Sequence, residues 1–290
     1  MRQAFITSLL LITVSSAASA QRLLDWPVRT SAEPTAITRG PEAAFWNPAA
    51  VAHAGGRGEI IITDQRTPSI IGLNGFAAAG SLRLDERTTF AAGYQHVSID
   101  DISETSTSPL PDTGQPTFSI GEDQLAIAVA HALGTGVSAG AAFRYQRSNE
   151  TGVNESSTML GAGMLASLRT FGRPVVGASV FTQNGDVRYV AGLQAGITMA
   201  ADVEVRGGYG VRGGENLVAL EHRIGITGIW RRTFSLTGGV ASADAGAERS
   251  WEPVVGASVR LSRYELGVLR ENLSSDFGAA YSFRFRLGLK

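Results

Sequence analysis

The 290-residue sequence contains no cysteine, and its single lysine is Lys290. Without cysteine there can be no disulfide framework, thiolate zinc site or iron–sulfur cluster. Charged residues make up only 18% of the chain, and 25 basic side chains stand against 26 acidic ones. This balance excludes the basic surface of a sequence-independent nucleic-acid binder, and also a disordered polyelectrolyte. We therefore expect no nucleic acid among the partners.

Long apolar runs are also missing: after residue 20, no stretch reaches the roughly 18 consecutive apolar residues that favour a membrane-spanning helix. The segment Met1–Ala20 differs from the rest of the chain. It has a basic residue at Arg2, an apolar stretch over Ile6–Val14 and a final run of Ser and Ala. These features predict a secretory signal peptide over residues 1–20, cleaved before Gln21. We expect the mature chain to be exported.

Motifs for catalysis or metal binding are not found either. The four histidines are His53, His96, His131 and His222, and no Glu-x-x-His, His-x-His or Gly-x-Ser-x-Gly pattern occurs. A hydrolase built into a barrel would need a Ser or Asp at the same height as a His. The strands predicted below bring no such set together. We therefore expect no enzymatic activity, no cofactor and no metal.

The sequence does contain segments in which apolar residues alternate with small or polar residues, with a period of two. From Phe277 to Leu289, the apolar residues Phe, Ala, Tyr, Phe, Phe, Leu and Leu alternate with Gly, Ala, Ser, Arg, Arg and Gly. Successive side chains of a strand point to opposite faces, whereas a helix would scatter these aromatics around its axis. This segment is therefore predicted to be a strand with one apolar face.

The same pattern recurs along the chain and predicts about 14 strands. We place them near residues 58–65, 70–84, 88–99, 122–133, 136–147, 157–170, 174–184, 187–199, 202–211, 216–230, 233–242, 250–261, 264–271 and 276–289. Tight turns such as 134–135 alternate with longer polar connections such as 100–121. Short turns at one end and longer loops at the other are typical of an outer-membrane barrel. The expected fold is an all-β, transmembrane antiparallel β-barrel with an N-terminal hatch or plug segment.

A soluble β-sandwich is the alternative fold, but it would place many Lys, Glu and Asp on its exposed face. Here the second face carries Gly, Ser, Ala and Gln with scattered Arg and Glu, which suits a crowded barrel interior. Outward aromatic residues are predicted near both ends of the strands: Tyr94, Tyr145, Tyr189, Tyr209, Trp251, Trp230 and Tyr264. Two aromatic girdles around an apolar band favour the membrane barrel.

Inward-facing charges are the candidates for lining the lumen. They are Arg144, Arg188, Glu204, Arg206, Glu221, Arg223, Arg260, Glu265, Arg284 and Arg286. A ring of one sign would indicate an ion-selective pore. The mixture of signs found here instead favours ion pairs between neighbouring strands.

Residues 21–56 do not alternate, and their four prolines disfavour a central strand. The core Phe45-Trp46-Asn47-Pro48-Ala49 resembles the N-terminal motif of the FadL-like and PorV/PorQ outer-membrane β-barrel families. The Trp at position 46 is more similar to PorV/PorQ. The resemblance implies that residues 21–56 form a hatch inside a barrel of residues 57–290. It makes Phe45, Trp46, Asn47, Pro48 and Ala49 the hatch or gate candidates.

The FadL-like resemblance implies a channel for passive uptake of small hydrophobic molecules, with an apolar pocket running from the loops to Phe45–Ala49. The PorV/PorQ resemblance implies an accessory barrel of a protein secretion system, occluded and bound to secretion-system proteins. A purely structural barrel is the third possibility. In each case we expect the outer membrane of a Gram-negative bacterium. Outer-membrane lipid and the barrel-assembly machinery, the latter through the C-terminal strand, are the expected general partners.

Overall fold

The computed structural model describes residues 28–29, 31–68, 72–103, 117–150, 153–183, 185–200, 202–214, 220–245, 248–272 and 278–290. The predicted signal peptide, residues 1–20, and its cleavage point lie outside the described residues. Within the described ranges, no helix has the length and apolar character needed to cross a membrane.

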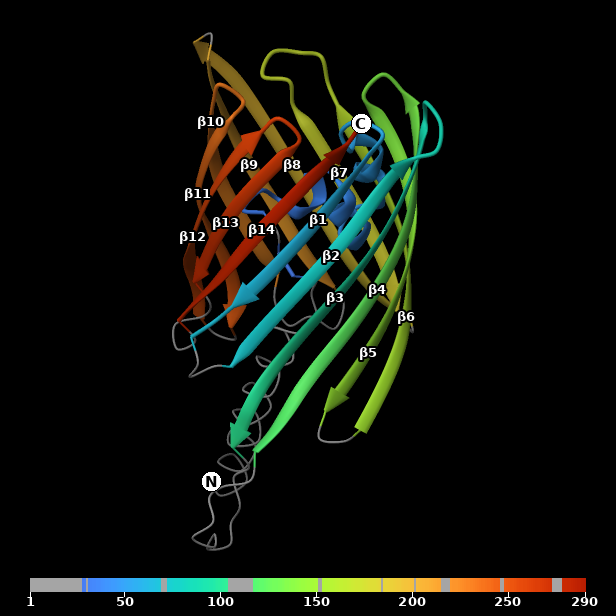
Figure 1. The fold of residues 1–290 in the computed structure, drawn as a ribbon, viewed down its shortest axis with the longest axis vertical. Coiled ribbons are helices and arrows are strands. Elements are labelled where there is room, and N and C mark those ends of the chain that lie inside the picture. Colours follow the sequence, from blue (N-terminus) through green and yellow to red (C-terminus); the bar gives the residue numbers. More distant parts are fainter. Residues whose placement is uncertain are drawn as a thin grey trace, which may run out of the picture.

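Fourteen antiparallel strands form one closed barrel, in which each strand pairs with its neighbours in sequence and β1 pairs with β14 (Figure 1). The strands are β1 (Gly58–Arg66), β2 (Leu73–Arg83), β3 (Thr88–Ser103), β4 (Thr117–Gly134), β5 (Val137–Glu150), β6 (Val153–Ser167), β7 (Val175–Gln183), β8 (Asp186–Ala200), β9 (Val203–Gly214), β10 (Glu221–Trp230), β11 (Phe234–Ala245), β12 (Glu248–Leu261), β13 (Tyr264–Asn272) and β14 (Ala279–Leu289). The predicted fold class is confirmed.

The two ends of the barrel differ. At the turn end, uppermost in Figure 1, tight turns such as 135–136 join the strands and the chain terminates at Lys290. At the opposite end, the loop end, the longer connections join pairs such as β3 and β4. The short turns therefore lie at one end of the barrel and the longer loops at the other.

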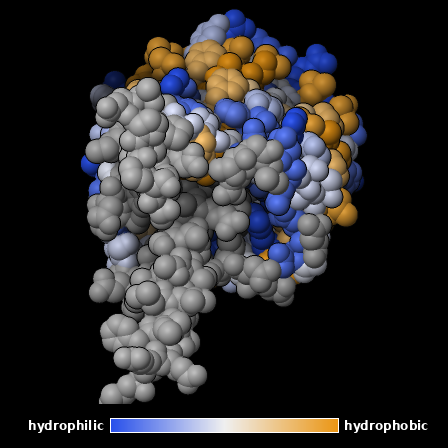
Figure 2. Space-filling model, turned by 90° about the horizontal axis from the view of Figure 1, so that it is seen from below, coloured by the Kyte–Doolittle hydropathy of each residue, from blue (hydrophilic) through white to orange (hydrophobic). Residues whose placement is uncertain are grey.

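The period-two pattern of the sequence becomes an inner and an outer face. In β7, residues 175, 177, 179 and 181 are buried, and the residues between them are exposed. Large apolar side chains stand exposed on the outside, among them Ile62, Leu125, Val129, Leu160, Val180, Leu193, Ile226, Leu236, Val255 and Phe283. Figure 2, a view from the loop end, shows hydrophobic residues in orange along parts of the outer edge. In a soluble protein, an outer surface of this size would be mostly polar, whereas here it is rich in exposed apolar side chains.

Strand boundaries differ from the predicted ones mainly at the loop end. β3 continues to Ser103, β4 begins at Thr117, β5 continues to Glu150 and β6 begins at Val153, and β9, β11 and β12 also extend two or three residues past their predicted loop ends. Most of these extensions pair in register, for example Asn149 with Asn154, but β3 and β4 shift register between Ile99 and Ile102. In the β4 extension the apolar residues Phe118 and Ile120 share the parity of buried Glu122, opposite to the outward apolar residues of the strand body, so the predicted pattern does not continue to the strand end. The longer β3 also leaves Tyr94 near the middle of its strand.

The described N-terminal residues, 28–29 and 31–56, lie inside the barrel and are called the plug here. The plug contains three short 3-10 helices, η1 (Thr35–Ile37), η2 (Pro41–Phe45) and η3 (Pro48–His53), drawn in blue in Figure 1. Proline at the first position begins η2 and η3, where its missing N–H costs nothing and its fixed φ suits a helical turn.

The plug packs against one side of the barrel. η1 contacts β7 and β8, η2 contacts β1 to β5, and η3 contacts β3 to β6. The main hydrophobic core joins plug residues such as Ala36, Trp46 and Val51 to wall residues such as Ala128 and Phe181. The interior of the barrel is thus filled on one side by apolar residues, many of them alanine, with Trp46 and Phe181 among them.

Candidate functional site

Asn47, in the middle of the motif, connects three segments of the chain. Its side chain is fully buried, and its Oδ1 accepts a hydrogen bond from the Ala49 N–H at 3.2 Å, which caps η3. Its Nδ2 donates to the Ala36 carbonyl at 2.7 Å and to the Met164 carbonyl at 3.0 Å. One amide therefore fixes η3 to η1 and both to strand β6.

The residues beside Asn47 are attached to the wall through their backbone. The Ser179 hydroxyl donates to the Trp46 carbonyl at 2.5 Å, and the Ser138 hydroxyl donates to the Ala49 carbonyl at 2.9 Å. The Trp46 ring is 2% exposed, and the Arg212 guanidinium carbon lies 5.8 Å from the ring centroid. These contacts hold the predicted gate residues as a fixed wedge.

Wall glycines allow the plug to approach this closely. A Cβ on Gly93 would lie 2.6 Å from Cε2 of Phe45, and one on Gly140 would lie 2.6 Å from the backbone nitrogen of Ala49. A Cβ on Gly163, Gly177 or Gly210 would lie 2.1–2.8 Å from Asn47, Ala36 or Pro34, and one on Gly192 or Gly208 would lie 3.1 Å from Pro34. Together they form the glycine seat: Gly93, Gly140, Gly163, Gly177, Gly192, Gly208 and Gly210. Any larger side chain there would occupy the space of the plug.

Near the loop end, the plug reaches across the lumen. The Val28 N–H donates to Gln95 Oε1 on β3 at 2.9 Å. The guanidinium of the next residue, Arg29, forms ion pairs with Glu221 on β10 and Glu271 on β13. Because β10 lies across the barrel from β3, residues 28–29 form a crossbar between the two sides.

The crossbar ends in a group of five charged residues, called the loop-side network. Its members are Arg29, Arg212, Glu221, Arg223 and Glu271. Arg212 Nε donates to Glu221 Oε2 at 2.7 Å, and Arg223 Nη2 donates to Glu271 Oε1 at 2.6 Å. The pairing extends beyond adjacent strands, because β10 and β13 are not neighbours in the sheet.

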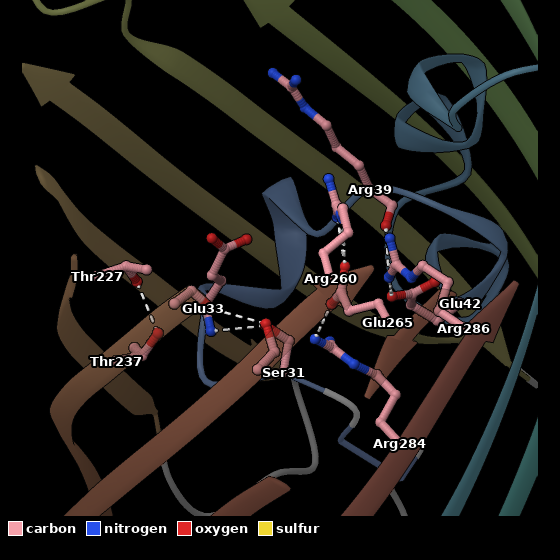
Figure 3. A network of polar contacts seen from close by, with 12 residues as sticks. Ser31, Glu33, Arg39, Glu42, Thr227, Thr237, Arg260, Glu265, Arg284 and Arg286 are labelled. Carbon is pink, nitrogen blue, oxygen red and sulfur yellow. Dashed lines mark hydrogen bonds and ion pairs between the residues drawn. The ribbon is translucent and has the colours of Figure 1, made fainter. Parts of the chain in front are cut away.

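A second group of charges, the turn-side network, lies near the other end of the plug (Figure 3). Its members are Glu42, Glu59, Arg260, Glu265, Arg284 and Arg286. Glu265 Oε1 accepts from Arg284 at 2.6 Å and its Oε2 accepts from Arg260 Nε at 2.9 Å. Glu42 from the plug pairs with Arg286. Each network therefore includes one plug residue that completes the pairing of wall residues.

The other predicted lumen residues lie outside these networks. Arg144 is 2% exposed and its guanidinium carbon lies 3.6 Å from the centroid of the Phe181 ring. Glu204 Oε1 accepts from Arg206 Nε at 2.8 Å within β9, and Arg188 is half-buried on β8. The sequence had indicated which residues face inward. Their grouping depends on which strands face each other across the closed barrel.

A cavity of about 630 Å³ occupies the part of the lumen that the plug leaves free. Its wall combines plug residues 31–33 and 37–39 with residues of the β6–β7 turn and of strands β7 to β14. Much of the wall is polar or charged, and Phe45–Ala49 are not part of it. The cavity therefore differs from the expected apolar pocket. Ser, Thr, Arg and Glu at inward positions of β9 to β14, such as Ser235, Thr237 and Arg260, give the free space its polar wall, among glycines and a few apolar residues such as Leu269.

The histidines are dispersed. His96 Nδ1 lies 2.9 Å from Asp123 Oδ1, and His131 Nδ1 lies 3.2 Å from the Thr88 hydroxyl at the turn end of β3. His222 Nδ1 lies 2.6 Å from the Tyr209 hydroxyl. Among the described residues, no group of three or more His, Asp or Glu has the arrangement of a metal site.

The fourth histidine makes a contact that the sequence did not suggest. His53 Nε2 lies 3.1 Å from the Ser138 hydroxyl. Because that hydroxyl donates its proton to the Ala49 carbonyl, His53 is the donor and does not act as a base toward Ser138. Burial, and secondarily the charge of Arg39, lower the pKa of His53 to about 4. This serine–histidine pair therefore secures the plug.

Several important residues escaped the sequence analysis. Arg29 and Glu42 lie in a segment without alternation, so no pattern showed which way they point. Ser138 and Ser179 look like ordinary inward positions. The glycine seat did leave a signal, because its members share the inward phase of their strands, but only the folded plug explains it.

No protein-family model and no curated protein matches the sequence. Among solved structures, the toluene transporter TbuX of Ralstonia pickettii is similar with a TM-score of 0.62 at 10% identity, covering 87% of this chain and 94% of that one. The toluene transporter TodX of Pseudomonas putida follows with 0.58 at 11% identity, covering 91% and 97%. The CymD monoaromatic hydrocarbon channel has 0.58 at 10% identity, covering 86% and 93%. At these identities the likeness establishes a shared barrel fold.

Proposed function

We propose that this protein is an outer-membrane channel that lets small hydrophobic molecules cross passively, as its FadL-like motif predicts. It carries out no chemical reaction in this proposal. The observation that carries the proposal is the one-sided seating of the plug. The three short helices of the plug contact β1–β8, while Arg29 and Glu42 reach β10, β13 and β14 through ion pairs. A cavity of about 630 Å³ remains beside β7–β14. Small-molecule sites typically have volumes of about 300–1,000 Å³.

The membrane location is supported by the outside of the barrel. Exposed apolar residues cover the outer face, and Tyr189, Trp230, Trp251 and Tyr264 stand exposed among them. A closed barrel satisfies every strand without an open edge, as a membrane requires. The three structurally similar proteins are named for transport of toluene or monoaromatic hydrocarbons, which agrees with a hydrophobic solute.

The proposed route runs along the free side of the lumen, and a pair of tryptophan variants tests it. Thr227 is 5% exposed and lines the cavity, whereas its neighbour Ile226 points outward and is 61% exposed. Thr227→Trp places a large ring in the cavity. Ile226→Trp adds the same ring to the outer face. The assay is uptake of an apolar fluorescent dye by liposomes that contain each protein and have lipopolysaccharide in the outer leaflet, which slows direct entry of apolar molecules.

We expect wild type and Ile226→Trp to raise uptake equally above empty liposomes, and Thr227→Trp to lower it toward the empty level. Folding of each variant is checked by the heat-dependent shift of the barrel on a gel. Failure of the wild type to raise uptake would overturn the proposal and favour the secretion-accessory or structural alternatives. Equal uptake by Thr227→Trp and wild type would place the route elsewhere.

A further inference from the structure

Positive charge is in excess in one part of the cavity wall. Arg39 of the plug, Arg173 of the β6–β7 turn, Arg206 of β9 and Arg232 of the β10–β11 turn all line the cavity. We call these four residues the arginine cluster. They come from four separate segments that meet only in the closed barrel, near its turn end.

The carboxylates near the cluster do not balance it. Glu204 accepts from Arg206 at 2.8 Å and also lies in the electrostatic field of Arg173 and Arg232. Glu33 interacts electrostatically with Arg39 and Arg206. The other glutamates of the described cavity wall, Glu59 and Glu265, pair with arginines of the turn-side network.

Arg39 shows the effect of this excess. Its guanidinium makes a hydrogen bond with the Ser167 hydroxyl at 3.1 Å, at the end of β6. In Figure 3 its side chain extends away from the Glu42–Arg286 pair. Partial desolvation, and next the neighbouring charge of Arg206, lower the pKa of Arg39, while its side chain stays exposed to solvent. Guanidinium donors grouped on the turn-end wall of this cavity, three of them exposed to solvent, attract anionic oxygens.

Two members of the cluster also occupy unfavourable backbone positions. Arg173 has φ of 42° and Arg232 has φ of 55°, in the left-handed region that Gly and Asn adopt more readily. Both residues lie in tight hairpin turns, whose geometry calls for positive φ, and both line the same cavity.

We propose that the arginine cluster binds a small oxyanion, with a carboxylate or phosphate group held by guanidinium donors in the turn-end cavity. This goes beyond the proposed passage of hydrophobic molecules, because it assigns an anionic ligand to a specific place. It does not depend on transport, so binding is measured on the full-length protein in neutral detergent.

The strained turn supplies a matched pair of variants. Asn suits left-handed φ, so the double variant Arg173→Asn/Arg232→Asn removes two charges without harming the turns. The control is Arg231→Asn. Arg231 precedes Arg232 in the same turn with φ of 52°, but it contacts Asp202 and Trp230 and is not part of the cavity wall.

Calorimetric titration with sodium phosphate and with sodium benzoate tests the proposal, with benzyl alcohol as the neutral probe. We expect at least one of the two anions to bind and benzyl alcohol not to bind. Binding of phosphate would identify a phosphate group as the ligand chemistry, and binding of benzoate would identify a carboxylate. The double variant should weaken binding about tenfold or more, because two charge-assisted contacts are lost. Arg231→Asn should bind as the wild type does.

A third variant keeps the proposal testable if the double variant fails to fold. Glu204→Gln removes a competing carboxylate and should tighten anion binding severalfold. The proposal is overturned if neither anion binds the wild type, or if Arg231→Asn weakens binding as much as the double variant. Unchanged or weaker binding by Glu204→Gln would also overturn it.

Discussion

At the scale of single residues, the interior depends on arginine. The planar guanidinium has five donors in a fixed fork, so one side chain can serve two carboxylates. Arg29 does this by contacting both Glu221 and Glu271, and a single glutamate, Glu265, accepts from two arginines. A lysine ammonium is a point charge and would fit these bridges poorly. The near absence of lysine is compatible with this use of arginine.

His53 makes the seating of the plug depend on pH. Its pKa is lowered to about 4 in the folded protein, against about 6.5 for a free histidine. Between these values an unseated plug would bind a proton that the seated plug does not. The seating is therefore weakened as pH falls from about 6.5 toward 4, and this residue contributes no pH dependence above that range.

A single introduced cysteine can report this effect, since the chain has no other. With Ala50→Cys, buried in η3, we expect thiol labelling to accelerate below pH 6.5 in proportion to the exposure of the plug, after correction for thiolate concentration. Adding His53→Gln, whose amide can still donate to Ser138, should remove the acceleration. Labelling that rises equally in both proteins would mean that another group controls the response.

At the scale of elements, the strands were largely predictable and the plug was not. The inner and outer faces follow from residue alternation, as in Ala279–Leu289, because lipid and lumen impose opposite demands on adjacent side chains. Mostly polar strand ends such as Val153–Ser156 pair with the neighbouring strand, although neither lipid nor the packed lumen requires alternation there. The motif at 45–49 indicated a hatch. Its contacts with Gly140 and Met164 join residues about a hundred positions apart, and no local pattern encodes them.

The glycine seat predicts an unusual response to a small substitution. Ala in place of Gly usually favours a strand, but a Cβ on Gly140 would lie within 2.6 Å of the Ala49 nitrogen and 2.5 Å of the Pro48 carbonyl carbon. Backbone atoms cannot move aside easily. We expect Gly140→Ala to destabilise plug seating by about 1–3 kcal/mol, a range typical of overpacked sites.

The control is Gly238→Ala on β11, where an added Cβ meets no atom within 4 Å. Labelling of a cysteine at position 50 should be faster in Gly140→Ala and unchanged in Gly238→Ala, while the melting of the barrel stays similar in both. If the two variants label at the same rate, wall glycines do not determine the position of the plug.

At the scale of the whole molecule, the barrel and the plug have different sources of stability. Backbone pairing closes the ring from β1 to β14 without any plug atom. The plug is retained by the apolar core, the glycine seat and the two charge networks. Removing it would leave Arg286 without Glu42, so the free barrel should be less stable than the complete protein while remaining closed.

Deleting residues 21–56 tests this division. We expect the shortened chain to keep the heat-dependent gel shift of a closed barrel and to show a larger single-channel conductance than the full protein in planar bilayers. Loss of the gel shift would show that the plug is needed for closure. An unchanged conductance would show that the free side of the lumen already limits ion flow.

The position of the plug also constrains the order of events in biogenesis. The plug directly precedes β1, and its crossbar at Val28–Arg29 lies near the loop end, while β1 begins at the turn end. If the ring closed first, the charged crossbar would have to be threaded through the whole lumen. Threading is avoided when the plug settles on the growing sheet before Gly58–Arg66 pairs with Tyr281–Leu289. The last seam to form therefore encloses a plug already in place.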